Sequence, residues 1–394
     1  MLNTFCIFVQ LIITIKCLKN MENPFPVSNY VSPEYFCNRE SEANLLINNI
    51  ENGIHTTLFS IRRLGKTGLI KHVLQKMSKE KNTDCIYFDI LSTQSQTEFT
   101  TLLSNEIIKK FPPQKTVGKK FIDAIRSFRP MLTYDVLTGT PELSLDIASD
   151  KVKERSLMEI FQFLDSRNKP TVVAIDEFQQ ILHYKEKNTE ALLRSIMQEM
   201  RNIRFVYCGS HQQMMNEIFN SAKRPFFASC QNMYLDKIAI EDYKPFIIRH
   251  FEAQKKDITD ECVDFILEWT CVHTYYTQYV CNRVFASGMK KIKLQDVQQM
   301  CFDILKENEA VYFQYRNLLT DVQWQFLKAL AKETELIQPY SADFIFKYKL
   351  GAAASVKRSL DALLDKEMIY YHQSAPEPFY AVYDKFLMRW LQRG

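Results

Sequence analysis

Short apolar runs alternate with helix-like segments over the first half of the chain. Runs of roughly four to eight apolar residues are typical of strands buried in a parallel sheet, and apolar residues recurring every three or four positions are typical of helices. The predicted strands are 55–61, 85–90, 171–175 and 203–208, and the predicted helices are 41–50, 66–77, 99–111, 152–164 and 191–200. The alternation predicts an α/β fold in which helices flank a parallel sheet.

The alternation is interrupted after Pro112-Pro113. Two strand-like segments, 131–136 and 143–147, flank the sequence Thr138-Gly139-Thr140-Pro141, which has the composition of a turn. Strand-like segments around such a turn predict a β-hairpin. We therefore expect a hairpin insertion near residues 131–147, before the strand at 171–175.

The pattern changes near residue 236, and from there to about residue 306 the signals are mainly helical. The last part predicts three helices, two short aromatic strands and a closing helix, at 321–332, 341–347, 353–366, 368–373, 378–383 and 384–392. Three helices followed by a hairpin is the order of a winged helix. The predicted domains are a core at 21–235, a helical region at 236–310 and a winged helix at 311–394.

Residues 1–20 are treated separately from the domains. The run from Phe5 to Ile15 is apolar except at Gln10 and Thr14, and it is shorter than the roughly 20 residues that span a bilayer. It fits a secretory signal poorly, because it follows no basic segment, and Met21 reads as a fresh start. We interpret residues 1–20 as a disordered extension or a start-site artefact, with a weak membrane anchor as the alternative.

Composition narrows the class of protein. With 394 residues, 46% hydrophobic and 24% charged, the chain is expected to fold into two or three domains. The net charge of +4 is small for this length, so the whole chain has no strong attraction to nucleic acid. None of the 10 cysteines forms a Cys-x-x-Cys pair, so a zinc site has no support and reduced thiols in the cytoplasm are expected.

The segment from Leu58 to Thr67 links the first predicted strand to a helix and ends in Gly65-Lys66-Thr67. It matches the end of a P-loop, in which backbone amides and a helix N-terminus hold phosphate oxygens. Lys66 would contact the β- and γ-phosphates, and the Thr67 hydroxyl would bind Mg²⁺. An ordinary strand-to-helix turn with an exposed lysine is the alternative.

Ser60 stands where the usual P-loop pattern has its first glycine, and serine resists a positive φ. The loop is nevertheless predicted to bind a nucleotide. The predicted nucleotide-binding residues of this segment are Ser60, Arg62, Arg63, Leu64, Gly65, Lys66, Thr67 and Gly68.

A second motif supports the first. The apolar strand Thr171–Ile175 runs directly into Asp176-Glu177, and two carboxylates at the end of a buried strand are costly unless they serve a purpose. Asp176 would hold Mg²⁺, and Glu177 would orient and activate the attacking water. Two solvated acids at a strand end are the alternative. Together the two motifs predict binding of ATP with Mg²⁺.

Polar residues also follow the strand at 203–208. Ser210 is the first candidate for contacting the γ-phosphate or the attacking water, and His211 is the second. The alternative for Ser210 is a helix N-cap. Arg224 is a candidate finger reaching the phosphate of a neighbouring molecule. A solvated or salt-bridged arginine is the alternative for Arg224.

These motifs resemble those of AAA+/STAND-type ATPases related to the archaeal ATPase family. The resemblance covers nearly the whole chain after Met21. It rests on Tyr35–Glu40, Phe59–Thr67, Ala174–Phe178, Cys208–Ser210, Thr270–Gln278 and the C-terminal Val382–Asp384 with Phe386 and Arg389–Leu391. Within Tyr35–Glu40, which is similar to a motif near the adenine, Arg39 is the implied nucleotide contact and Asn38 replaces a glycine. In Thr270–Gln278, Val272 and Thr274 replace a glycine and a proline.

The resemblance implies three parts: an ATPase core, a helical lid at 236–310 and a winged helix. It implies an ATP-driven switch or remodeller and does not identify a client. The expected partners are therefore ATP and an unknown protein client, and a nucleotide-dependent oligomer is a further hypothesis. The alternatives are a nucleotide-sensing scaffold with little turnover and a DNA-binding winged-helix regulator. DNA is weakly supported, because residues 321–394 contain ten Lys and Arg against nine Asp and Glu, a net of +1. No membrane partner is expected.

Overall fold

The computed structural model describes residues 23–28, 30–126, 130–134, 141–145, 150–373 and 375–393. The predicted extension at 1–20 and the central residues of the predicted hairpin turn lie outside these ranges. The chain forms two compact units, one made of residues 39–236 and the other of residues 237–394 together with the segment before residue 39. Each unit is described by itself.

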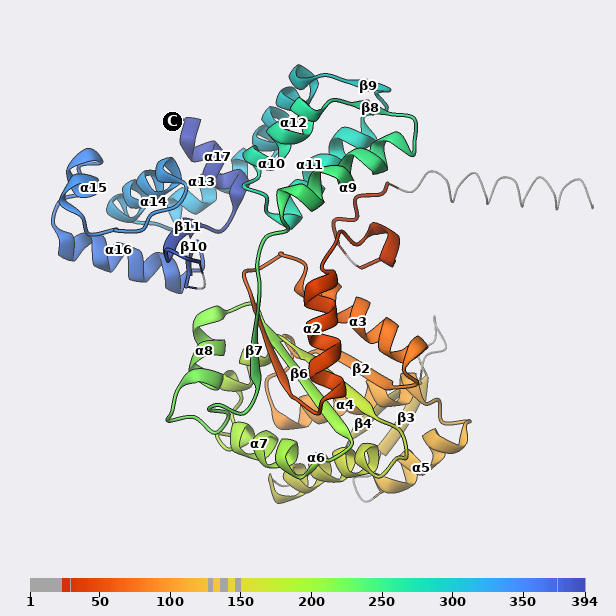
Figure 1. Ribbon diagram of the computed structural model, residues 1–394. Coiled ribbons are helices and arrows are strands. Elements are labelled where there is room, and N and C mark those ends of the chain that lie inside the picture. Colours follow the sequence, from red (N-terminus) through yellow and green to blue (C-terminus); the bar gives the residue numbers. More distant parts are fainter. Residues whose placement is uncertain are drawn as a thin grey trace, which may run out of the picture. The chain divides into compact units, whose positions relative to one another are not determined.

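A five-stranded parallel sheet forms the centre of the first unit, in the order β2-β5-β6-β1-β7 (Figure 1). The strands are β1 (Thr56–Ser60), β2 (Asp84–Asp89), β5 (Thr171–Asp176), β6 (Ile203–Gly209) and β7 (Gln231–Leu235). All residues of β1 and β5 are buried, as expected for strands covered on both faces. Because the strands are parallel, the ends of β1, β5 and β6 meet at one edge of the sheet.

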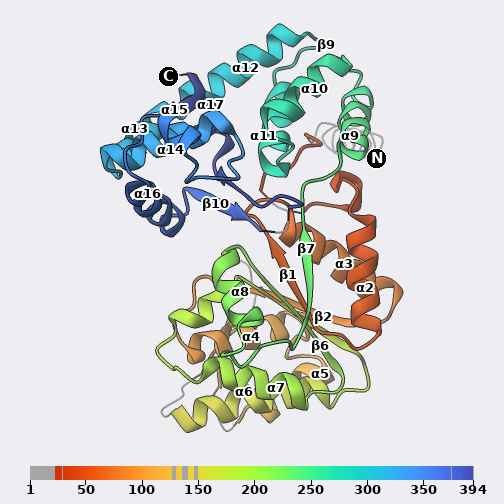
Figure 2. The same cartoon turned by 60° about the vertical axis from the view of Figure 1, so that its left-hand side comes forward.

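Helices cover both faces of this sheet (Figure 2). Helices α2 (Glu40–Glu51) and α3 (Lys66–Glu80) lie on one face. The other face carries α4 (Gln96–Lys110), α6 (Asp150–Asp165), α7 (Thr189–Glu199), α8 (Gln212–Asn220) and the 3-10 turn η3 (Phe178–His183). On that face Phe59, Val173, Ile175, Phe205 and Tyr207 alternate along the strands and join one hydrophobic core with these helices.

The predicted elements of this unit did not include β7, α8, η3 or the short helix α5 (Thr116–Ala124). The interruption after α4 does contain a pair of antiparallel strands, β3 (Pro130–Tyr134) and β4 (Pro141–Leu145). The strand β4 is fixed to α4, because the side chain of Asn105 accepts a 2.6 Å hydrogen bond from the Leu143 amide. The pair therefore extends the face of the core that α4 covers.

The second unit begins with a helical region of α9 (Ile240–Glu252), α10 (Asp260–Trp269), α11 (Thr274–Ala286), α12 (Leu294–Glu307) and α13 (Glu309–Asn317), with the short strands β8 (Asp257–Ile258) and β9 (Lys291–Ile292). The segment before residue 39, which includes η1 (Pro33–Tyr35), packs on these helices. Phe25 is fully buried against Phe251, and Asn23 and Asn282 each donate a side-chain hydrogen bond to a carbonyl of the other segment.

The same unit ends in the predicted winged helix, formed by α14 (Asp321–Glu333), α15 (Ala342–Lys347), α16 (Ala353–Asp365), β10 (Ile369–His372), β11 (Phe379–Val382) and α17 (Lys385–Arg393). It shares one hydrophobic core with the helical region. The rings of Phe386 and Tyr276 lie 4.7 Å apart, and Arg389 donates to the carbonyl of Trp269 at 2.7 Å. In the part of the chain that the structure describes, every helix is too short or too polar to cross a bilayer.

Candidate functional site

The loop between β1 and α3 has the backbone shape of an anion cradle. Gly65 precedes the helix with φ at +97°, a conformation that glycine adopts without steric cost. The first turn of α3 carries no acidic residue, so the positive end of the helix dipole is left unopposed. The other positive φ in the loop falls on Arg63 rather than on Ser60. Serine at position 60 is therefore compatible with the loop, and its hydroxyl donates to the Ile61 carbonyl at 2.8 Å.

Thr67 and Asp176, which are far apart in sequence, are brought together at the edge of the sheet. The Thr67 hydroxyl donates to Asp176 Oδ2 at 2.8 Å. Both Asp176 and Lys66 are buried, with 2% and 7% of their surfaces exposed. Burial alone would raise the pKa of the Asp176 carboxyl group, but the Lys66 ammonium group and three hydrogen-bond donors outweigh burial and lower it. Asp176 is therefore ionised at neutral pH.

Two of these donors were missed by the sequence analysis. Tyr87, from the edge strand β2, donates its hydroxyl to Asp176 Oδ2 at 2.9 Å. Cys208, from β6, lies with its thiol 3.1 Å from Asp176 Oδ1 and is fully buried. A residue on each strand that pairs with β5 thus holds the carboxylate. Tyr87 is marked in the sequence only by its place on a predicted strand, and Cys208 also begins the Cys208–Ser210 segment of the resemblance, which gave it no role at Asp176.

Glu177 is oriented by a separate set of contacts. Its backbone adopts a left-handed conformation, with φ at +53°, which is uncommon for a residue other than glycine. Its Oε2 atom accepts hydrogen bonds from the Ser210 hydroxyl at 2.8 Å, the Ser210 amide at 3.2 Å and the Gln179 side chain at 2.6 Å. The structure therefore brings the predicted residues Glu177 and Ser210 into direct contact, and it adds Gln179.

A third carboxylate lies near this pair. Asp89 ends β2 and lies in register with Asp176 at the end of β5. Partial burial raises its pKa, and the negative charges of Asp176 and Glu177 add to this, while the charge of Lys66 acts in the opposite direction. The edge of the sheet therefore concentrates negative charge around one buried lysine, an arrangement suited to a cation that arrives with its ligand.

Two of the predicted arginines are Arg39, which precedes α2, and Arg62 in the loop. Arg39 is buried and donates to the carbonyl of Leu64 in the loop at 3.3 Å, while its other terminal nitrogen pairs with Glu42. Arg62 approaches Ser210 with a long 3.5 Å contact. Arg39 thus supports the shape of the loop through its backbone.

Two candidates play other structural parts. His211, rather than Ser210, is the N-cap of α8 and accepts from the Met214 amide at 3.3 Å. Arg224 forms ion pairs with Glu190 at 3.5 Å and Glu217 at 3.4 Å. Among the described residues, Arg224 makes no contact with the group around Asp176. Its assignment as a finger stays a prediction.

Comparison with known families assigns most of the chain. Residues 36–272 match the family described as an ATPase domain predominantly from Archaea. The chain belongs to this family. Its members are P-loop ATPases, and the loop ending in Gly65-Lys66-Thr67 and the carboxylates Asp176 and Glu177 lie within the matched residues. Residues 310–393 match a second family, described as a probable winged helix domain, in agreement with the elements from α14 to α17. Comparison with the curated proteins gives no match.

Solved structures agree with the archaeal ATPase fold over nearly the whole chain. The Walker-type ATPase PABY2304 of Pyrococcus abyssi matches with a TM-score of 0.65 and 16% identity, covering 94% of this chain and 99% of that one. The ORC2 protein of Aeropyrum pernix, in complexes with ADPNP and ADP, matches with a TM-score of 0.57 and 14% identity, covering 94% and 96%. At these identities the likeness establishes the fold alone.

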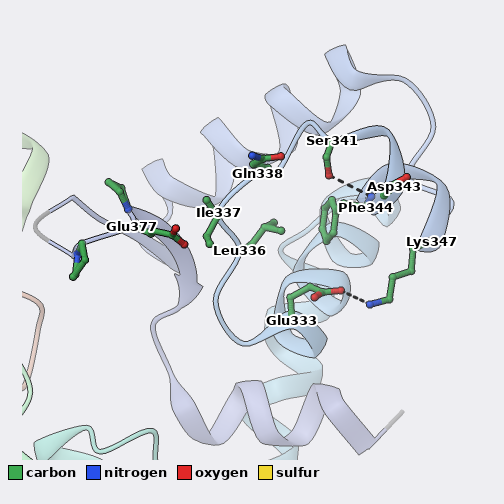
Figure 3. Close-up of a pocket in the computed structure, with 11 residues that line it drawn as sticks. Glu333, Leu336, Ile337, Gln338, Ser341, Asp343, Phe344, Lys347 and Glu377 are labelled. Atoms are coloured by element: carbon green, nitrogen blue, oxygen red, sulfur yellow. Dashed lines mark hydrogen bonds and ion pairs between the residues drawn. The ribbon is translucent and has the colours of Figure 1, made fainter.

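The winged helix has a pocket of about 600 Å³ between the α14–α15 connection, α15 and the hairpin (Figure 3). Its charged lining residues are Glu333, Asp343, Glu377 and one base, Lys347, which pairs with Glu333 at 2.6 Å. Three carboxylates and one engaged lysine disfavour phosphate groups. This face therefore adds no support for DNA binding.

Proposed function

We propose that this archaeal-type ATPase binds ATP with Mg²⁺ and hydrolyses it to ADP and phosphate, acting as a nucleotide-driven switch or remodeller. The observation that carries the proposal is the 2.8 Å hydrogen bond between Thr67 and Asp176, beside the buried Lys66. A loop shaped for phosphate and a carboxylate held ionised by a lysine meet at one point. The ADPNP and ADP complexes of the Aeropyrum pernix ORC2 protein support the same ligand class.

The residues present fit a magnesium ion. Mg²⁺ prefers oxygen ligands and is held by one or two protein groups together with the phosphates. The Asp176 carboxylate and the Thr67 hydroxyl supply such oxygens, and Tyr87 and Cys208 fix the carboxylate from both sides. When bound, the ion would neutralise charge on the β- and γ-phosphate oxygens.

Phosphate binding and activation of the water depend on groups of the chain itself. The loop amides and the Lys66 ammonium group would hold the phosphates in place, and Lys66 would stabilise the negative charge that develops during transfer. Glu177 would accept a hydrogen bond from the attacking water and orient it toward the γ-phosphate. Ser210 and Gln179 position Glu177, since both donate to its Oε2 atom.

A nucleotide-sensing scaffold with little turnover is the second candidate. The specific observation that favours it is that Oε2 of Glu177 already accepts three hydrogen bonds, from Ser210 and Gln179. An attacking water would have to displace one of these donors or use the other oxygen of the carboxylate. Slow hydrolysis would result unless these bonds rearrange.

Phosphate release by four variants tests the proposal. We expect Lys66→Ala and Glu177→Gln to abolish release, while Glu177→Gln still binds ATP as the unchanged protein does. Lys79→Ala, on the exposed end of α3, and Glu80→Gln are matched controls that should retain full activity. Turnover that survives in both Lys66→Ala and Glu177→Gln would contradict the proposal. ATP binding with no turnover in the unchanged protein would favour the scaffold.

The proposed finger role of Arg224 requires a second copy of the chain. Arg224 would have to leave Glu190 and Glu217 to reach a neighbouring phosphate. Sedimentation velocity with and without ATP and Mg²⁺ tests this role. We expect a larger species with nucleotide, in which Arg224→Ala lowers turnover per subunit. A monomer under both conditions would exclude the role.

A further inference from the structure

A second pocket lies at the opposite edge of the same sheet from the nucleotide site. It has a volume of about 410 Å³ and lies within the first unit. Its lining residues come from the segments before β1, β6 and β7, from the start of β6 and from the second half of α7, elements that can be followed in Figure 2. They include Gly53, His55, Arg194, Met197, Arg201 and Arg204. The strand β6 spans seven residues, so the two edges are separated by roughly 20 Å. A nucleotide bound at Lys66 does not reach this pocket.

The charged residues that line this pocket are all arginines. Asp and Glu are absent from the lining, and Arg194, Arg201 and Arg204 form no ion pair within the part of the chain that the structure describes. Elsewhere in this unit arginines do have acidic partners, as Arg167 has Asp84. Three guanidinium groups around one small pocket repel each other, and an anion would relieve that repulsion.

Arg204 is fixed in place by the backbone. Its Nη1 atom donates to the carbonyls of Arg201 at 2.8 Å and Ile203 at 2.9 Å, while its Nε atom is buried with no hydrogen-bond partner. Gly53 makes room for this group, because a Cβ atom there would lie 3.2 Å from Arg204 Nη2. Leaving a buried charged donor unsatisfied is costly, and the negative charge of an anion in the pocket would offset part of that cost.

His55 adds a neutral donor. The Phe205 amide donates to its Nδ1 atom at 3.1 Å, which leaves the ring hydrogen on Nε2. Burial and the charges of Arg204 and Arg194 lower the pKa of His55 to about 4, so the ring is uncharged at neutral pH. The Gln198 side-chain amide faces Arg194, and with its oxygen turned toward the guanidinium group it would accept from both terminal nitrogens at 3.1 Å. The pocket thus presents donors and no acid.

We propose that this arginine pocket binds a small phosphate-bearing anion, such as the diphosphate group of a nucleotide. Guanidinium groups donate paired hydrogen bonds that match phosphate oxygens. The volume lies in the usual range of small-ligand pockets. The confined arrangement of the arginines favours a small ligand over nucleic acid, whose contacts would extend along a surface. The site is separate from the proposed ATP site and does not depend on it.

Calorimetric titration of the full chain with inorganic pyrophosphate tests the proposal. The Lys66→Ala variant is used as the background, so that pyrophosphate bound at the P-loop does not contribute. We expect binding in this background, and at least a tenfold higher Kd when Arg194→Gln and Arg201→Gln are added. Arg126→Gln with Arg155→Gln, two exposed arginines of the same unit, removes the same charge and should leave the Kd unchanged.

The single variant Arg201→Gln controls for misfolding, because the exposed side chain of Arg201 makes no hydrogen bond among the described residues. This variant should also raise the Kd for pyrophosphate. No pyrophosphate binding in the Lys66→Ala background would overturn the proposal. So would a Kd that the Arg194 and Arg201 substitutions leave unchanged. A short DNA duplex is titrated in parallel. Arginine-dependent binding of the duplex without binding of pyrophosphate would replace the small ligand by nucleic acid.

Discussion

Ser210 donates two hydrogen bonds, one from its hydroxyl and one from its amide, to a single oxygen of Glu177. The carboxylate that would activate water is thus fixed by the residue that follows β6, the strand between β1 and β5. We expect Ser210→Ala to lower kcat at least about tenfold, because a misplaced base loses much of its effect, with the KM for ATP unchanged. Ser210→Thr keeps a hydroxyl and should restore most of the rate. Equal rates for the alanine and threonine variants would argue against positioning through the hydroxyl.

Tyr87 should affect the requirement for metal rather than for nucleotide. Its hydroxyl donates to the Asp176 oxygen that also accepts from Thr67. Groups that orient a metal ligand typically contribute about tenfold or more in metal affinity. For Tyr87→Phe we expect the Mg²⁺ concentration that gives half-maximal hydrolysis to rise about tenfold, with a similar rate at saturating Mg²⁺. The phenyl ring is kept, so its contact with Lys71 remains as an internal control. An unchanged Mg²⁺ requirement would exclude this role.

Gly209 is required by close packing. A Cβ atom there would lie 2.1 Å from Gln179 Oε1 and 2.7 Å from Met215 Sδ. Gly209→Ala should therefore destabilise the first unit by about 1–3 kcal/mol and displace Gln179 from Glu177. Hydrogen exchange of the β6 amides measures the loss. Adding Gln179→Ala removes one of the two clashing groups, so the double variant should recover part of the stability. Additive effects of the two substitutions would show that the clash is absent.

Lys385 should make the second unit more stable at alkaline pH. Burial lowers its pKa from 10.5 to about 8, and its ammonium group donates to the Val382 carbonyl at 2.8 Å. Between these two pH values the unfolded chain holds a proton that the folded chain has lost, so stability rises with pH. The full rise is about 3 kcal/mol.

Tryptophan fluorescence during urea unfolding at pH 8, 9 and 10 measures this effect, because Trp269, Trp324 and Trp390 all lie in the second unit. Lys385→Met should remove the rise, and Lys366→Met, at an exposed lysine, should keep it. If the free energy of unfolding rises with pH by the same amount in the Lys385→Met variant, other titrating groups cause the rise.

The sequence predicted four of the five sheet strands, because β1, β2, β5 and β6 are apolar runs. It missed β7, where Gln231 and Asn232 give an edge strand with no such pattern. The P-loop and the pair of acids were visible, since each is a local sequence motif. Tyr87 was invisible as part of the site, because its contact with Asp176 joins residues 89 positions apart and depends on strand order. The arginine pocket joins several separate segments, which the sequence gives no means to assemble.

The two units illustrate the same limit. Phe25 belongs to the core of the second unit, although more than two hundred positions separate it from the helices that bury it. The sequence around Phe25 does not indicate which distant helices bury this side chain. The shared core of α11 and α17, seen in the contact of Tyr276 with Phe386, is likewise a long-range result of packing.

The burial of Cys208 against Asp176 supplies a reporter of motion at the proposed ATP site. Burial raises the pKa of this thiol well above its ordinary value, so the reactive thiolate is scarce in the closed protein. Alkylating reagents would modify it chiefly during transient openings of the central strands. The labelling rate at this position, measured by peptide mass spectrometry, would then report how often the strands open. A tightly held triphosphate would lower that labelling rate.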